Sequence, residues 1–271
     1  IQRHRYQNTV SDDLWRAVEQ AGAKGLTDIA HDFTRKPGVP LVKAEATCAN
    51  GATTLKLAQS EFSRDRMAEV AQKPQSWRVP VLVQAGRTPP LRHVLEGSAT
   101  LTLPGCEPVV VNGGQLGYFR TLYSPQMSAA NAKALPELAP IDQLGLMRDA
   151  FALSQAGYQP LTPAMALLEA IRSDANPVVA EGAVGRWSAM YTILSDQKQK
   201  AKLSELARNA WLGRLQQLGF DPKEGEGLAD SSLRAELVGA LGMMADPTVA
   251  AQARTRFAAL AADPRALDGP L

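Results

Sequence analysis

Three histidines are the residues best suited to metal or acid–base chemistry in this sequence of 271 residues. A hydrolytic zinc site on a helix needs the pattern His-Glu-x-x-His, in which two imidazoles hold the metal and the glutamate activates water. None of His4, His31 and His93 is followed by glutamate, and no two of them are four residues apart. No cluster of histidines and cysteines has zinc-binding spacing. We therefore predict no catalytic residue and no metal ligand in this chain.

Motifs for cofactors and nucleophilic catalysis are also missing from the sequence. It contains no P-loop, no dinucleotide-binding glycine pattern after a strand, and no Gly-x-Ser-x-Gly nucleophile turn. Gly113-Gly114 lies between two expected strands, where a tight turn is a better interpretation than a phosphate-binding loop. We predict no cofactor-binding residue and no cofactor in this chain.

The only two cysteines, Cys48 and Cys106, each lie in a strand-like run. We interpret each as a buried free thiol. A disulfide between them is the alternative, which two cysteines alone do not establish. The cellular localisation is left unknown.

Composition and charge argue against two classes of partner. The apolar fraction of 45% and the charged fraction of 21% are ordinary for a globular protein. The formal net charge is only +2, and the basic residues are scattered along the chain, so we expect no nucleic-acid partner. The longest apolar stretches are shorter than the roughly 18 residues that span a bilayer, so we expect no membrane partner either.

The first 36 residues have the pattern of two short helices. Ser11 is a suitable N-cap for a helix over 11–22, and a second helix over 26–35 carries apolar residues at i, i+3, i+4 and i+7. Those residues are Leu26, Ile29, Ala30 and Phe33. Two short helices cannot bury such faces alone, so we expect residues 1–36 to be the last helices of an upstream domain.

Between Val39 and Tyr123 the hydrophobic period changes to two, as in strands. Asn50-Gly51 is a strong hairpin signal, and turn residues separate about seven short strands. No crossover helices intervene, so we predict an antiparallel β-sandwich over residues 37–124. The charged span 61–75 is expected to be an irregular, exposed excursion.

Helical patterns replace the strands after Tyr123. About six consecutive helices of 10–20 residues follow, with the cap-and-proline start Asp246-Pro247 on the last of them. Short connections suggest antiparallel pairs stacked as in an armadillo- or HEAT-like α-solenoid. We predict an α-helical C-terminal domain over 125–271, cut short at its end. The fold class is thus α+β and multidomain.

Arg120 lies at the end of the last expected strand, directly before the chain turns helical. We interpret the run from Gly117 to Arg120 as structural, with Tyr118 and Phe119 packing around the arginine. An arginine at such a crossing needs a carboxylate if it is buried. Asp149 on the first long helix is the expected partner. The alternative is that Arg120 points to solvent and Asp149 caps a neighbouring helix.

Short sequence blocks in a fixed order resemble one known family. They are Asn8-Thr9 with Asp13-Leu14-Trp15, Phe33-Thr34 with Pro37–Val42, Gln59–Phe62, Trp77–Pro80, Asn112–Tyr123, Asp149–Leu153 with Ala156-Gly157, and Leu218–Phe220 with Leu233-Arg234. They resemble the C-terminal part of the aminopeptidase N family, which includes puromycin-sensitive and endoplasmic-reticulum aminopeptidases. Phe33 stands where the family usually has tryptophan, and Val39 where it usually has an aromatic residue. The order of the blocks over nearly the whole chain makes the resemblance specific.

The resemblance implies a parent protein that is a zinc metallopeptidase and removes N-terminal residues from peptides. The family's zinc motif and its Gly-x-Met-Glu-Asn motif lie upstream of the matched region, so zinc is implied for the parent and not for this chain. Residues 1–36 would then end a thermolysin-like domain. The chain itself would shape and close the substrate chamber, with the parent's catalytic domain and a peptide substrate as partners. The alternative is a protein-interaction scaffold from a catalytically dead relative.

Overall fold

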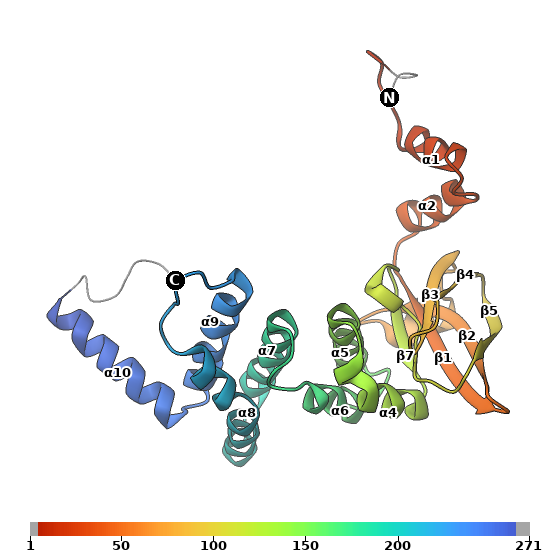
Figure 1. Cartoon of the computed structure of the whole chain (residues 1–271). Coiled ribbons are helices and arrows are strands. Elements are labelled where there is room, and N and C mark those ends of the chain that lie inside the picture. The colour runs from red at the N-terminus through yellow and green to blue at the C-terminus, as the bar shows by residue number, and fades with distance from the viewer. Residues whose placement is uncertain (1–4, 264–271) are drawn as a thin grey trace. The chain divides into compact units, whose positions relative to one another are not determined.

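The computed structural model describes residues 5–263, and Figure 1 shows the order of its helices and strands. His4 lies outside the described residues. The chain divides into two compact units. The strand unit comprises the chain up to Ala134 together with Gly145–Met165. The helical unit comprises Leu135–Leu144 and the chain from Ala166 onward.

Two sheets form the centre of the strand unit. The strands are β1 (Val39–Ala49), β2 (Ala52–Phe62), β3 (Val79–Ala85), β4 (Leu91–Leu95), β5 (Ser98–Pro104), β6 (Val109–Val110) and β7 (Arg120–Tyr123). One sheet has the order β5-β2-β1-β7 and the other the order β4-β3-β6.

The expectation of an entirely antiparallel arrangement is wrong at one pair, because β7 runs parallel to β1. The chain leaves the four-stranded sheet after β5, forms β6 in the other sheet, and only then returns beside β1. Parallel pairing needs such a long connection, which a hairpin cannot supply.

The predicted hairpin at Asn50-Gly51 is confirmed. Ala49 pairs with Ala52, so the connection has two residues, and both have positive φ, 52° for Asn50 and 74° for Gly51. This geometry fits a type I′ turn, which asparagine and glycine tolerate. The turn fixes the register of β1 against β2 along their whole length.

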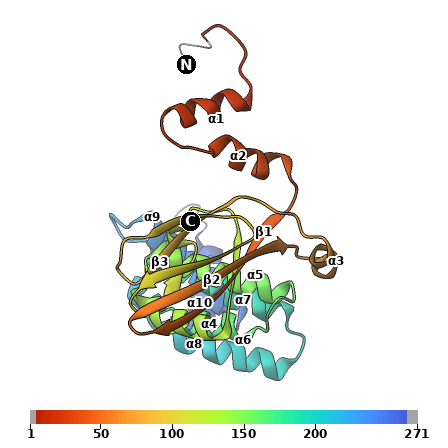
Figure 2. The same ribbon diagram turned by 90° about the vertical axis from the view of Figure 1, so that its right-hand side faces the viewer.

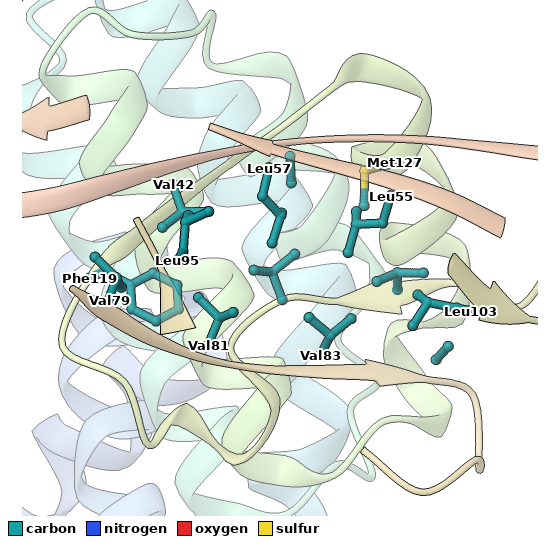
Figure 3. Close-up of a cluster of buried hydrophobic side chains, with 14 of the residues drawn as sticks. Val42, Leu55, Leu57, Val79, Val81, Val83, Leu95, Leu103, Phe119 and Met127 are labelled. Carbon is teal, nitrogen blue, oxygen red and sulfur yellow. The ribbon is translucent and has the colours of Figure 1, made fainter. Parts of the chain in front are cut away.

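One apolar cluster lies between the two sheets, as Figure 3 shows. The four-stranded sheet contributes Val42, Leu55 and Leu57, each at most 2% exposed. The three-stranded sheet contributes Val79, Val81, Val83 and Leu95, each at most 3% exposed. Burying a side chain of this size stabilises the fold by about 1.5–3 kcal/mol, so this cluster holds the two sheets together.

The interpretation of the two cysteines as buried free thiols is wrong. Cys48 and Cys106 form a disulfide with a Cα–Cα separation of 5.5 Å, and both residues are exposed. Their partnership depends on the register of β1, β2 and β5, which brings the end of β1 close to the turn after β5.

Four helices and parts of two more lie in the strand unit among the described residues. They are α1 (Ser11–Gln20), α2 (Leu26–Arg35), α3 (Met67–Gln72), α4 (Pro125–Ala134), α5 (Pro140–Gln155) from Gly145 onward, and α6 (Thr162–Ala170) up to Met165. Figures 1 and 2 show α1 farther from the strands than α2. The short helix α3 occupies the span that the sequence suggested was irregular.

The helical unit contains α7 (Pro177–Ile193), α8 (Gln197–Leu218), α9 (Leu228–Met243) and α10 (Pro247–Ala262), preceded by η3 (Leu135–Glu137) and by the part of α6 from Ala166 onward. Helix α9 packs against both α7 and α8, and α10 packs against α9. The predicted cap at Asp246 is confirmed, because its carboxylate accepts the backbone N–H groups of Thr248 and Val249 at 2.9 and 3.0 Å. The same carboxylate accepts a hydrogen bond from Arg208 at 2.8 Å.

Among the described residues, no helix combines the length and the hydropathy that crossing a membrane requires.

Candidate functional site: an apolar groove on the strand unit

Side chains that could bind a metal ion do not cluster in the described part of the chain. Within residues 5–263, no three histidine, cysteine, aspartate or glutamate side chains come together as a metal site. His31 forms a hydrogen bond with Asp12 at 2.7 Å, whereas His93 lies on β4. The zinc that the resemblance implies for the parent therefore does not fit these residues.

The strand unit does contain a groove on the outer face of its three-stranded sheet. Its volume is about 470 Å³. The floor comes from β3 and β4, where Pro80 pairs with Val94 and Leu82 pairs with Arg92. These positions alternate with the core-facing valines of β3, so their side chains point away from the core. Helix α2 and the loop 113–118 form the two walls.

The wall formed by the loop 113–118 presents two apolar side chains to solvent. Leu116 is 81% exposed and Tyr118 is 68% exposed. The buried Asn112 holds this loop, because its amide donates to the Gly117 carbonyl at 2.9 Å and accepts from the Gly117 N–H at 2.8 Å. Any Cβ at position 117 would overlap the ring of Phe119, so glycine is required there. The exposed side chains therefore stand on a fixed backbone.

The wall formed by α2 is attached to the sheet through the buried carboxylate of Asp32. It accepts hydrogen bonds from the Arg78 backbone N–H at 2.8 Å and from the Arg78 guanidinium at 3.1 Å. Lys36 pairs with it at 2.7 Å. Burial raises the pKa of Asp32, but the hydrogen bonds from Lys36 and from the Arg78 backbone outweigh burial and hold the pKa below its usual 3.8. Phe33 then reaches across the groove to Tyr118, with 6.3 Å between the ring centroids.

Arg92 lies on the floor of the groove, where the other lining residues of β3 and β4 are apolar except for His93. Arg92 is exposed, and within residues 5–263 its guanidinium makes neither a hydrogen bond nor an ion pair. A cation without a partner beside an apolar surface suits a ligand that combines apolar groups with a carboxylate.

The predicted pair of Arg120 and Asp149 is confirmed. The guanidinium donates to the carboxylate at 2.8 Å, and the backbone N–H of Thr121 donates to its second oxygen at 2.8 Å. Burial raises the pKa of Asp149, and both donors oppose that rise without cancelling it. The expectation that Tyr118 shields the pair is wrong, because Tyr118 points to solvent. The ring of Phe62 lies beside Arg120 instead, 6.0 Å from the guanidinium carbon.

Local sequence patterns did not reveal the groove. Its floor and walls come from α2, β3, β4 and the loop 113–118, and none of these segments has a motif by itself. The run Gly117–Arg120 was interpreted as structural, and that interpretation holds for Phe119, which is 6% exposed, and for Arg120. A glycine followed by two aromatic residues was the one available signal, because one aromatic residue anchors the loop and the other stays exposed.

Replacing Asp32 with asparagine tests the attachment of α2. The change should reduce the free energy of opening of α2 and β3 by about 1 kcal/mol at neutral pH, since both cationic partners are partly exposed. A lowered pKa means that the carboxylate stabilises the folded state above pH ~3.8 and loses this effect as pH falls through the folded-state pKa. The free energy of opening from hydrogen exchange of the α2 and β3 amides should therefore differ between wild type and Asp32→Asn. This difference should be constant above about pH 5 and should shrink below about pH 4. A difference in opening free energy that does not change with pH would show that the ionised carboxylate of Asp32 does not attach α2.

A double-mutant cycle tests the pair of Arg120 and Asp149. Arg120→Ala leaves a buried carboxylate with one donor, whereas Asp149→Ala leaves the Thr121 N–H without its acceptor. Each single change should cost about 2–4 kcal/mol, and the two should couple by about 1–2 kcal/mol. The readout is the free energy of opening from hydrogen exchange of β7 and the adjoining turns of α5. Asp149→Asn is the matched control, because an amide oxygen can still accept from Thr121. Strict additivity of the two alanine changes would show that the pair does not act as a unit.

Comparison with known proteins places the chain in one family. The family model described as "ERAP1-like C-terminal domain" matches residues 108–271. Aminopeptidase M1 of Arabidopsis thaliana is 26% identical over 288 residues, which cover 97% of this chain and 32% of that protein. Aminopeptidase 2 of Candida albicans is 26% identical over 274 residues, covering 98% of this chain and 29% of that protein.

The puromycin-sensitive aminopeptidase of Caenorhabditis elegans is 29% identical over 169 residues, covering 58% of this chain and 17% of that protein. The chain thus spans about a third or less of the length of these curated relatives. The resemblance found in the sequence blocks is confirmed. The chain belongs to the ERAP1-like C-terminal domain family and corresponds to the C-terminal region of an M1 aminopeptidase.

Proposed function

We propose that this chain is the non-catalytic C-terminal part of a zinc metallo-aminopeptidase that removes N-terminal residues from peptides. One observation carries the proposal. Nearly the whole chain aligns with proteins named aminopeptidases, yet it accounts for only 32% and 29% of the length of two of them. The zinc and the catalytic residues belong to the remainder of the parent, and this chain contributes none of them.

The proposed division of the chain follows from the sequence and differs from the two compact units, in which α4 and Gly145–Met165 group with the strands. Residues 1–36 end a thermolysin-like catalytic domain, residues 37–124 form a β-sandwich, and residues 125–271 form a solenoid-like helical domain. The apolar cluster shared by the two sheets supports the sandwich. The packing of α9 against α7 and α8, and of α10 against α9, supports the solenoid, since each repeat of such a stack contacts only neighbouring repeats.

The partner proposed for the groove is the parent's catalytic domain. The wall formed by α2 belongs to the segment that would end this domain, so a surface next to it is suitably placed to meet the same domain. The exposed Leu116 and Tyr118 on a fixed backbone support this, because rigid apolar side chains are typical anchors of protein interfaces. The helical domain would shape and close the chamber that admits the peptide.

A protein-interaction scaffold derived from a catalytically dead relative is the second candidate. The same exposed groove favours it, because an apolar surface can bind a separate protein as well as a domain of the same chain. The zinc content and the peptidase activity of the parent distinguish the two, since only the first candidate requires both.

Truncation of the parent tests the proposed role in the chamber. A parent that ends near position 124 should retain its zinc and still hydrolyse a single aminoacyl nitroanilide. Its preference between long and short peptides should change at least several-fold, measured as the ratio of kcat/KM values, because the wall that meets the far end of the peptide is gone. An unchanged ratio would contradict the chamber role, and a zinc-free, inactive full-length parent would favour the scaffold.

Charge substitutions in the groove test the proposed contact with the catalytic domain. Leu116→Asp and Tyr118→Asp should each weaken association of this chain with a separately produced catalytic domain by at least tenfold, because a desolvated carboxylate on an apolar surface is costly. Thr102→Asp, at an exposed position of β5, is the matched control. Calorimetric titration gives the affinities. Equal affinities for all variants would show that the groove is not the contact surface.

A further inference from the structure

The disulfide between Cys48 and Cys106 lies at the open end of the core. Cys48 is the last but one residue of β1, and alternation places it on the same face as the buried Val42 and Ala44. Its cross-strand partner Thr53 pairs in turn with Leu103 of β5. Thr53 and Leu103 are 4% and 3% exposed, whereas both cysteines are exposed. The disulfide therefore lies on the solvent side of Thr53 and Leu103, which are the last buried residues at this end of the core.

Two hydrogen bonds accompany the disulfide at this end. The chain turns at Gly105, whose N–H donates to the Gly51 carbonyl at 2.8 Å. The hydroxyl of Thr53 donates to the Gly105 carbonyl at 2.7 Å. These contacts connect the tip of the β1–β2 hairpin to the turn after β5, and none of them needs the sulfur atoms. They can hold the local backbone when the disulfide is open.

The disulfide closes a ring that passes through both sheets. The two cysteines are separated by 58 positions, and the enclosed segment contains β2 and β5 of one sheet together with β3 and β4 of the other. Closing a loop of this length removes much of the conformational freedom of the unfolded chain, which stabilises the folded state. A covalent bond at the surface thus controls the stability of elements that lie deep in the unit.

We propose that Cys48–Cys106 is a thiol–disulfide exchange site that a dithiol reductant reaches in the folded protein. A thiolate of the dithiol attacks one cysteine sulfur, and the other cysteine leaves as a thiolate that takes a proton from solvent. The second thiol of the dithiol loses its proton and displaces the first cysteine. Two electrons and two protons pass from the dithiol to the protein, which yields two cysteine thiols and one oxidised dithiol.

Opening the ring should loosen the end of the core and leave the rest of the strand unit folded. The register of β1 against β2 and the buried Leu55 and Leu57 do not depend on the disulfide. The residues at the tip of the hairpin and in the turn after β5 lose their covalent connection. The chain would then be more stable in an oxidising than in a reducing environment, and local opening would increase most at this end of the sheets.

Kinetic trapping of the thiols in the full chain tests the exchange site. The oxidised chain is mixed with increasing dithiothreitol under native conditions, quenched with iodoacetamide and weighed by mass spectrometry. We expect no alkylated thiol before reduction and two after it, at a rate proportional to the dithiol concentration. Alkylation before any reductant is added would overturn the disulfide. A rate that saturates at the rate of global unfolding would overturn attack on the folded protein.

The variant Cys48→Ser/Cys106→Ser distinguishes the effect of losing the disulfide from any other effect of the reductant. It should resemble the reduced chain, with the melting temperature of the strand unit lower by about 10 °C, the shift expected for opening a loop of this length. Exchange of the amides at 49–54 and 102–107 should quicken in both, while the amides at 41–44 stay protected. The melting temperature of the variant should not respond to dithiothreitol. Equal melting temperatures of the oxidised chain, the reduced chain and the variant would overturn the role of the disulfide in stability.

Discussion

One buried carboxylate, that of Asp149 on α5, joins β7, the last strand of the strand unit, to that helix. Strand β7 pairs with β1 over only four residues, from Arg120 to Tyr123, and a short edge strand has little support from its own ladder. Asp149 adds two hydrogen bonds from outside the sheet, one from Arg120 and one from the Thr121 backbone. The loop 113–118 leads into this strand, so the position of the groove wall depends on the same carboxylate.

The sequence predicts those parts of the fold that depend on neighbouring residues. Asn50-Gly51 specifies its turn because both residues tolerate positive φ, and Asp246-Pro247 specifies a helix start because the carboxylate accepts nearby N–H groups. The pair of Arg120 and Asp149 was found because the elements that carry them must meet close to a crossing. The parallel partner of β7, the disulfide and the groove escaped prediction, since each depends on the register of strands that are distant in the sequence.

The groove combines exposed apolar side chains with a backbone that buried hydrogen bonds hold in place. Its exposed side chains are apolar, yet Asn112 and Asp32 hold both walls in place with buried hydrogen bonds. An exposed tyrosine on a mobile loop would lose entropy on binding, whereas one on a fixed backbone has already lost it when the chain folds. The buried polar contacts around the groove therefore fix both walls before any contact with the partner proposed above.

The two ends of β1 are secured by different kinds of chemistry. Before β1 begins, the ionised carboxylate of Asp32 attaches α2 to Arg78 at the start of β3. Where β1 ends, the bond from Cys48 to Cys106 closes the core. The ionic attachment fails in acid and is insensitive to reductant, whereas the covalent closure fails in reductant and is insensitive to acid. Because the apolar cluster between these ends needs neither, the strand unit can loosen the wall formed by α2 or the open end of its core separately, without losing its sheets.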